Sequence, residues 1–472
     1  MDDKKILAFS IVWKFLERFS VQFVNLITQI ILARLIAPEI FGCLSIILVF
    51  VNFADLLTQK GFGSSIVQLK ELRQGHINSV FVIGFGLAFL LVVVIFFCAP
   101  FVERFYAYDN ICNALRMLSV FLLFSPVSCI CNALLMREMD FKSIFMRGTL
   151  ASFCSCIVGI FMAVNSFGIW ALVAQILVNQ IFSTVFMFFR VKRHIGVLFK
   201  WNDFKEIFFF GRNVLITEVL LNVVEDCRVL LIGKFFSSQT LAFYDRGQVY
   251  PATLMRAVND SFFSAYFPYF SKKQSDWVGL KKNYLEALEL TSLVIFPLFL
   301  FLAACTPEII ILLLTEKWSE AIPFMIIFSI YQSVFSFQIV SKAALYAVGA
   351  SKIVLKIEMI KSALSVILLA LSVVYDAYLV AISLIAVRVV GSFFYVFNVK
   401  KIMGNISIVK QVWKIYLGGL LLFGMLLCMN LIDCNMIVLL LLKTLLFGCF
   451  FLALIKWINK DFYCKIIKRF FK

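Results

Sequence analysis

Polar side chains recur at helical spacing within a long apolar segment near the start of the sequence. Lys14, Arg18, Gln22, Asn25 and Gln29 fall within about 80° of one another when residues are placed about 100° apart, as in an α-helix. A stripe of this kind can recognise a polar group through charge and hydrogen bonds, whereas lipid would leave it unsatisfied. We therefore predict that this helix faces water or a polar ligand along one side.

Three further apolar segments carry polar stripes of the same kind. Their members are Asn52, Asp55 and Gln59 in the second segment, Glu218, Asn222, Glu225 and Asp226 in the seventh, and Asp245, Gln248, Arg256, Asn259 and Asp260 in the eighth. The first segment is cationic and the seventh is acidic, and these two segments open the two halves of the chain. Together the four stripes predict a hydrated central cavity.

Several cations lie deep within apolar segments. They are Lys14, Arg18, Arg116, Arg212, Arg228, Arg246, Arg256, Lys342, Lys361, Arg388 and Lys443. At about 3 kcal/mol for each cation at membrane depth, they cannot all face lipid. Most must face water, a carboxylate or the membrane interface. The alternative to a functional role is that cations near helix ends reach the interface and that the remainder pair with carboxylates to fix helix packing.

The elements that position these residues are membrane helices. Hydrophobic residues make up 62% of the 472 residues, charged residues only 15%, and the mean hydropathy is +0.98, so lipid must be the solvent. Apolar runs near the ~20 residues that cross a bilayer recur about fourteen times. The fold class is therefore predicted to be an all-α polytopic membrane protein with about fourteen transmembrane helices.

The distribution of positive charge orients the chain. Lys and Arg collect in alternate loops, including the segments 190–193, 400–401 and 456–472, while the opposite loops hold few cations. By the positive-inside rule both termini are predicted to be cytoplasmic. This asymmetry accounts for most of the net charge of +17 without a nucleic-acid partner. No removable signal peptide is evident in the charged start of the chain.

Two short matches indicate an internal duplication. Ile31 to Glu39 resembles Leu231 to Gln239, and Trp170 to Ala174 resembles Ala377 to Ala381 at a similar offset. The predicted organisation is a six-helix lobe over 1–200, a second six-helix lobe over 201–403, and two extra helices with a basic tail over 404–472. Because the two lobes have the same orientation, a pseudo-twofold axis is expected along the membrane normal. The substrate is then expected to bind between the two lobes.

Neither cysteines nor histidines predict a metal site. The thirteen cysteines are dispersed, mostly inside apolar runs, and none forms a CxxC pair. We interpret them as small packing residues. The two histidines, His76 and His194, lie in polar segments. We therefore expect no metal and no cofactor.

Several motifs, taken in order, resemble bacterial polysaccharide exporters, the Wzx-type flippases of the multidrug/oligosaccharidyl-lipid/polysaccharide (MOP) superfamily. The motifs are Trp13 to Phe19, Ile31 to Leu35, Pro38 to Gly42, Gly61 to Ser65, Arg137 to Lys142, Gly168 to Gln175, Ile232 to Phe236 and Glu316 to Trp318. They span the first 350 residues or so and particularly resemble the branch that exports colanic-acid-like and teichuronic-acid-like units.

The resemblance implies a two-lobed fold with alternating access. Its implied substrate is an undecaprenyl-pyrophosphate-linked oligosaccharide, moved from the inner to the outer leaflet of the bacterial inner membrane. A pyrophosphate needs paired cations away from lipid. Lys14, Arg18 and Arg256 are the expected pyrophosphate ligands, with Arg228 and Arg246 as further candidates. The implied partners are membrane lipids, a polysaccharide polymerase and the export machinery.

The remaining polar residues receive two expected roles. Amides are expected to bind sugar hydroxyls, and these are Asn25, Gln29, Gln248 and Asn259. Carboxylates are expected to balance the cations between cycles or to carry a coupling ion, unless they are structural pairs, and these are Asp55, Glu218, Glu225, Asp226, Asp245 and Asp260.

Two other functions remain open. A multidrug antiporter of the same superfamily would need an acidic, aromatic pocket for organic cations, whereas the first lobe here is cationic. A membrane glycan polymerase or ligase would need catalytic groups in a sizeable outer loop, whereas the longest predicted outer loop is short, near Cys305 to Glu320. We therefore expect a transporter and no enzyme.

Overall fold

A computed structural model describes residues 3–59, 62–69, 71–191, 195–273, 276–404, 407–432 and 434–458. Within these ranges every regular element is a helix, which confirms the predicted all-α class. The side chains of Lys14 and Arg18 lie outside the described part of the chain, although the backbone of both residues is helical.

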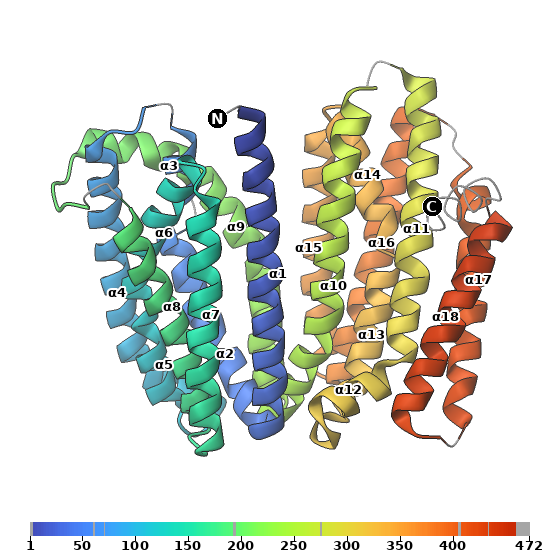
Figure 1. Ribbon diagram of the computed structural model, residues 1–472, viewed down its shortest axis with the longest axis horizontal. Coiled ribbons are helices and arrows are strands. Elements are labelled where there is room, and N and C mark those ends of the chain that lie inside the picture. The colour runs from blue at the N-terminus through green and yellow to red at the C-terminus, as the bar shows by residue number, and fades with distance from the viewer. Residues whose placement is uncertain are drawn as a thin grey trace. The chain divides into compact units, whose positions relative to one another are not determined.

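The chain forms two compact units, residues 1–242 and 243–472 (Figure 1). The first unit contains α1 (Asp3–Leu35), α2 (Pro38–Gln59), α3 (Phe62–Gln68), α4 (Gln74–Tyr106), α5 (Ile111–Ser119), α6 (Phe121–Arg137), α7 (Phe141–Val164), α8 (Ile169–Arg190) and α9 (Trp201–Phe235). The helix α10 (Ser238–Ser271) begins in the first unit and continues into the second.

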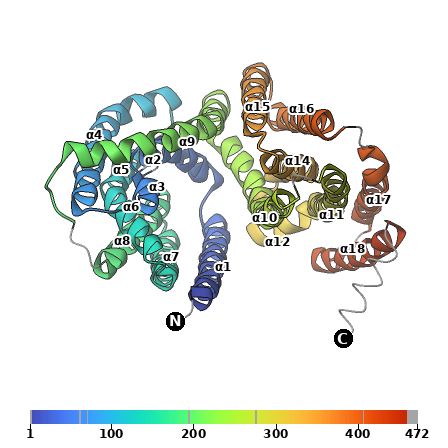
Figure 2. The ribbon, with the colours of Figure 1, turned by 90° about the horizontal axis from the view of Figure 1, so that it is seen from above.

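The second unit continues with eight further α-helices and two short 3-10 turns. These are α11 (Trp277–Ala304), α12 (Thr306–Leu314), the turn Glu316–Trp318, α13 (Ala321–Ser333), α14 (Ser336–Ala347), α15 (Ser351–Ser372), α16 (Ala377–Met403), α17 (Ile408–Cys428), the turn Met429–Leu431 and α18 (Met436–Ile458). Figure 2 shows many of these helices end-on, so their axes run in a similar direction within the unit.

Local sequence signals set where the helices begin. Asp140 and Asp276 precede α7 and α11, and each side chain accepts a hydrogen bond from the backbone N–H three residues later, at 3.1 and 2.9 Å. Pro38 occupies the first position of α2, where its missing N–H costs nothing. Gly404 ends α16 with a φ of 81°, which a side chain would disfavour.

Span lengths account for the predicted fourteen crossings. Ten helices or consecutive helix pairs in the described residues are long and apolar enough to cross a membrane. The other four long helices, α1, α9, α10 and α15, have 33, 35, 34 and 22 residues, which suffices for about 30 Å at about 1.5 Å per residue. These four helices carry intramembrane charges, which lower their hydropathy.

In the first unit, α7 packs between α1 and α8, and α9 packs against α2, α3 and α4. The start of α9 is fixed by an apolar cluster that includes Phe62, Ile77, Phe204 and Ile207. The seventh long helix is therefore part of the first compact unit, while the lobe boundary predicted from the repeat lies at residue 200. The repeat-based lobes remain a prediction, because compact units report packing and not duplication.

In the second unit, α11 packs against α13, α14 and α17, and α15 packs against α16. The final pair, α17 and α18, run side by side (Figure 1). A buried ion pair connects α18 to α12, because the Lys443 ammonium donates to Glu308, to Asn430 and to the backbone carbonyl of Ala304. Lys443 is 0% exposed. Its three donors are all used, so this cation has a structural role.

We predict that Lys443→Met destabilises the protein by about 3 to 5 kcal/mol, because the Glu308 carboxylate would remain buried without its counter-charge. The double variant Lys443→Met, Glu308→Gln should recover most of the loss. Thermal unfolding in detergent measures both effects. Lys282→Met is the control, since its 4.0 Å pair with Glu286 is exposed. Equal loss in the single and double variants would contradict the assignment.

Candidate substrate-binding site

A polar cavity of about 510 Å³ lies within the second unit, between α10, α14, α15 and α16. Its lining comprises three cations, one carboxylate, two amides and several apolar or aromatic side chains, namely Lys342, Lys361, Arg388, Glu358, Asn259, Gln338, Phe263, Phe335, Ile339 and Tyr346. The charged lining residues therefore leave an excess of two positive charges.

Helical spacing explains why these side chains converge. Glu358 and Lys361 are three residues apart on α15, and Gln338 and Lys342 are four apart on α14, so each pair occupies one helix face. The α16 helix contributes Arg388 and packs against both α14 and α15. The residues of each pair are thus close in the sequence and share one helix face. The faces themselves meet only because the helices pack together.

Glu358 is the hub of a hydrogen-bonded network. Lys361 Nζ donates to Glu358 Oε2 at 2.9 Å and to Gln338 Oε1 at 3.1 Å. Lys342 Nζ lies 3.4 Å from Glu358 Oε1, and the Tyr395 hydroxyl donates to the same oxygen at 2.7 Å. One carboxylate is therefore shared by two lysines and a tyrosine.

Arg388 is held differently. Its side chain is buried, and the guanidinium carbon lies 3.9 Å from the Tyr331 ring centre and 4.1 Å from that of Phe335. Its Nη2 donates to Gln332 Oε1 at 3.4 Å. Among the described residues its Nε has no hydrogen-bond partner. Aromatic faces and one amide thus hold this cation.

The predicted residues of α10 differ in position. Asn259 lines the cavity, and its side-chain amide donates to Asp260 at 3.4 Å. Arg256 is exposed and lies outside the cavity lining. Arg246 is buried, with its guanidinium 5.8 Å from the Trp318 ring centre. Two other residues of this predicted stripe, Asp245 and Gln248, are half-buried. Only Asn259 of this stripe joins the cavity.

The first unit contains the other predicted residues. Asp55 accepts hydrogen bonds from Gln59, one turn later, and from Ser125. Arg228 is buried and pairs with Glu225 at 2.6 Å, which is a local pair within α9. The other predicted residues with described side chains are half-buried, namely Asn25, Gln29, Glu218 and Asp226. Lys14 and Arg18 have no described side chains, and the roles predicted for all these residues remain predictions.

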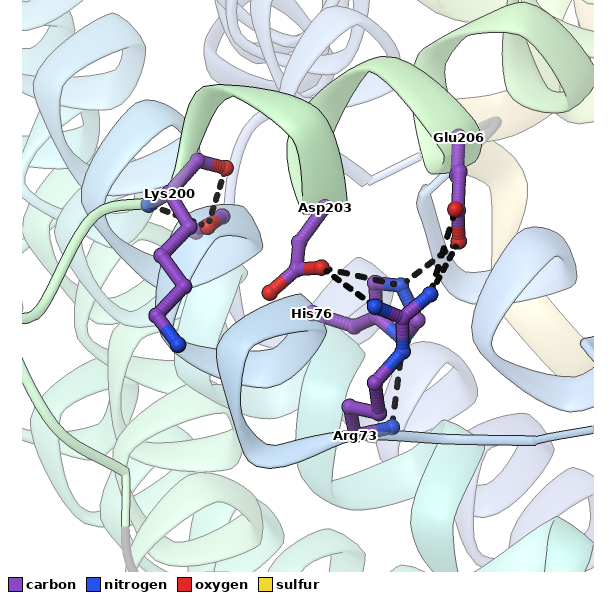
Figure 3. A network of polar contacts seen from close by, with 6 residues as sticks. Arg73, His76, Lys200, Asp203 and Glu206 are labelled. Atoms are coloured by element: carbon purple, nitrogen blue, oxygen red, sulfur yellow. Dashed lines mark hydrogen bonds and ion pairs between the residues drawn. The ribbon is translucent and has the colours of Figure 1, made fainter.

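A second polar network joins the start of α9 to the start of α4 (Figure 3). His76 is 0% exposed, and its Nδ1 accepts a hydrogen bond from the backbone N–H of Arg73 at 3.1 Å. Nε2 must therefore carry the ring proton, which it shares with Glu206 at 2.9 Å. Arg73 completes the network by pairing with Asp203 at 3.2 Å and with Glu206 at 3.0 Å.

This network acts as a clamp between two helix ends. The hydrogen bond from His76, helped by the positive charge of Arg73, holds the pKa of the Glu206 carboxyl below its usual value. Lys200, just before α9, exchanges two backbone hydrogen bonds with the Ser79 hydroxyl, at 3.0 and 3.1 Å. The polar setting of His76 was the one sequence feature that pointed to this clamp.

The cavity residues were only partly recognisable from the sequence. Lys342, Lys361 and Arg388 are among the cations predicted to lie within spans, but none was assigned to the site. A usable signal was Glu358 in an apolar run, three residues before Lys361. In the described part of the chain, no group of three His, Cys, Asp or Glu side chains could hold a metal ion. The arrangement can recognise an anion but presents no evident nucleophile.

Solved structures identify the fold. A structure described as lipid II flippase MurJ, inward closed conformation, aligns over 96% of this chain and 99% of its own, with a TM-score of 0.76 and 16% identity. An inward-facing multidrug resistance MATE family transporter of the MOP superfamily aligns over 88% of this chain and 98% of its own, with a TM-score of 0.61 and 14% identity. The fold is that of MOP superfamily transporters, as predicted.

The family is identified by sequence. Residues 31–323 match the model of the polysaccharide biosynthesis protein family, and the chain belongs to this family. It is 22% identical over 283 residues to the teichuronic acid biosynthesis protein TuaB of Bacillus subtilis (strain 168), covering 59% of this chain and 58% of that protein. It is 23% identical over 305 residues to the lipopolysaccharide biosynthesis protein WzxC of Escherichia coli (strain K12), covering 63% of this chain and 61% of that protein.

These matches span about three fifths of the length of the two curated relatives. The resemblance to polysaccharide exporters predicted from the motifs is confirmed at the level of the family.

The clamp predicts a pH dependence. Because the folded pKa of Glu206 lies below its unfolded value, its stabilisation is complete above the unfolded pKa of about 4.3 and is lost as pH falls through the folded pKa. Glu206→Gln should therefore lower the unfolding temperature at pH 7, and the difference from wild type should close below pH ~4. Thermal unfolding across pH measures this gap. Glu71→Gln, an exposed position, serves as control; a gap that does not change with pH would contradict the clamp.

Proposed function

We propose that this protein is a flippase that moves an undecaprenyl-pyrophosphate-linked oligosaccharide from the inner to the outer leaflet of the bacterial inner membrane. The observation that carries the proposal is the excess of positive charge that lines a cavity between membrane helices. Membership of the polysaccharide biosynthesis family supports it. The fold shared with a protein described as a lipid II flippase adds support.

An apolar groove in the second unit suits the lipid part of such a substrate. It has a volume of about 460 Å³, and its lining includes Phe337, Phe393, Trp413 and Tyr416. The groove and the polar cavity share the helices α14 and α16. A substrate with a charged head and an apolar tail needs both surfaces, whereas a small polar solute needs only the cavity.

Translocation requires no covalent chemistry. The membrane potential supplies about 2.3 kcal/mol per charge per 100 mV, which suffices in principle to move an anionic group outward. In the proposed cycle the carboxylates of α9, Glu218, Glu225 and Asp226, balance cations or carry a coupling ion. Both termini lie in the cytoplasm, and a polymerase with its export machinery receives the product.

Deletion of the gene tests this function directly. We expect lipid-linked oligosaccharide to accumulate on the cytoplasmic side only, because the polar head cannot cross lipid unaided. Mass spectrometry of lipid-linked intermediates in each leaflet measures this, and the intact chain restores export. Accumulation of externalised but unpolymerised units would instead indicate a polymerase or ligase. Drug sensitivity with normal glycan export would indicate a multidrug antiporter.

The predicted pyrophosphate ligands are tested by charge removal. The double variant Arg18→Ala, Arg256→Ala should lower glycan export at least tenfold, because two cations would be lost from the substrate path. Export is measured in the deletion strain at matched protein levels. Lys282→Ala is the control, since Lys282 is exposed and pairs only at the surface. Normal export by the double variant would exclude these two residues as ligands.

A further inference from the structure

Arg388 is an unusual buried cation. Its side chain is 8% exposed, and its Nε has no hydrogen-bond partner among the described residues. The one carboxylate that lines the same cavity, Glu358, is engaged by Lys342, Lys361 and Tyr395. Among the described residues this buried guanidinium has a spare donor and no carboxylate partner, and it therefore calls for an anion from outside the chain.

The two lysines also keep spare donors. An ammonium carries three N–H groups. Lys361 uses one on Glu358 and one on Gln338, and Lys342 uses one on Glu358 at 3.4 Å. Both lysines line the cavity beside Arg388. A ligand oxygen could therefore be bound from three helices, α14, α15 and α16.

Aromatic and amide groups complete the lining. Phe263, Phe335 and Tyr346 offer apolar faces, and Asn259 offers an amide. Aromatic faces and amides bind sugar rings and their hydroxyls. The cavity therefore fits an anionic group that is joined to a sugar better than it fits an isolated ion.

We propose that this cavity of the second unit binds an oxyanion group of the substrate. Arg388 is the residue that binds the anion, and Glu358 is an internal counter-ion that holds Lys342 and Lys361 when the cavity is empty. The proposal rests on the proposed flippase function and deepens it, because it names the part of the substrate that the second unit recognises. The oxyanion is either the carrier pyrophosphate or a carboxylate of the sugar, and both present the same oxygen chemistry.

The described lining of the cavity does not include the predicted ligands Lys14, Arg18 and Arg256. Arg256 lies outside its lining, and Lys14 and Arg18 belong to the other compact unit. Variants of the cavity residues therefore test a different set of residues from the predicted ligands.

Ligand-dependent thermal unfolding of the purified full chain in detergent tests the proposal. The probes are inorganic pyrophosphate and glucuronate, with glucose as the neutral control, at low ionic strength and without divalent cations. A ligand that binds only the folded state raises the unfolding temperature as its concentration rises. We expect at least one anionic probe to do so, and Arg388→Gln to weaken its apparent affinity at least tenfold.

A matched variant controls for the loss of a cation that packs on aromatic rings. Arg116 lies 4.2 Å from the Phe96 ring centre in the first unit, so Arg116→Gln makes the same chemical change outside the cavity. It should leave probe affinity unchanged. Each variant is compared with its own ligand-free unfolding temperature, so a general loss of stability does not obscure binding.

Glu358→Gln tests the internal counter-ion. Removal of the competing carboxylate charge frees Lys342 and Lys361, so we expect the anionic probe to bind several-fold more tightly. Weaker binding in this variant would contradict the counter-ion role. A purely structural Glu358 would lower stability without tightening binding.

The remaining outcomes distinguish the two possible oxyanions. They also distinguish the anion site from the proposed flippase function. Stabilisation by pyrophosphate assigns the cavity to the carrier head, and stabilisation by glucuronate assigns it to an acidic sugar. No effect of either anion, or an equal effect in Arg388→Gln, overturns the anion site. If that happens while deletion still traps lipid-linked units on the cytoplasmic side, this inference fails and the flippase function stands.

Discussion

The cost of charge inside the membrane is the constraint on which this structure depends. A charged side chain at membrane depth is stable only where water or a polar partner replaces the lipid. The long helices α1, α9, α10 and α15 carry several such residues. Of the ten spans in the described part of the chain that are apolar enough to cross alone, α16 and α18 each bury one cation, Arg388 and Lys443. The apolar helices can face lipid on one side. The polar helices need neighbours that satisfy their charges, and so their positions set where polar chemistry can occur.

The second unit satisfies its buried cations in two contrasting ways. Lys443 is fully satisfied, because all three of its N–H donors meet acceptors and its side chain is 0% exposed. The cluster around Arg388 is only partly paired, because three cations and one carboxylate line the cavity. Pairing offsets the cost of burying Lys443. At the cavity, one carboxylate cannot balance three cations, so positive charge remains available. The balance between cations and carboxylates therefore distinguishes a residue that fixes packing from one that is suited to a ligand.

The sequence predicted the features that depend on local spacing. About fourteen spans followed from runs of apolar residues, and Asp55 and Gln59 were placed on one helix face, where the structure has Gln59 donating to Asp55. The cavity did not follow, because Lys342, Glu358 and Arg388 lie on three helices whose neighbours are chosen by packing. Arg256 shares a predicted stripe with Asn259, yet only Asn259 reaches the cavity. Helical spacing gives the angle of a residue on its own helix but not the direction in which that helix faces.

The relation between the cavity and the apolar groove bears on the choice between a flippase and a drug antiporter. Gln338 lines the cavity and Ser392 lines the groove, and the Gln338 amide donates to the Ser392 hydroxyl at 3.2 Å. A hydrogen bond between two lining residues thus connects the cationic cavity to the apolar groove. An organic cation would be attracted by the groove but repelled by the excess positive charge of the cavity. A lipid with an anionic head would be favoured by both, which is why the charge sign, more than the shared fold, supports a lipid-linked substrate.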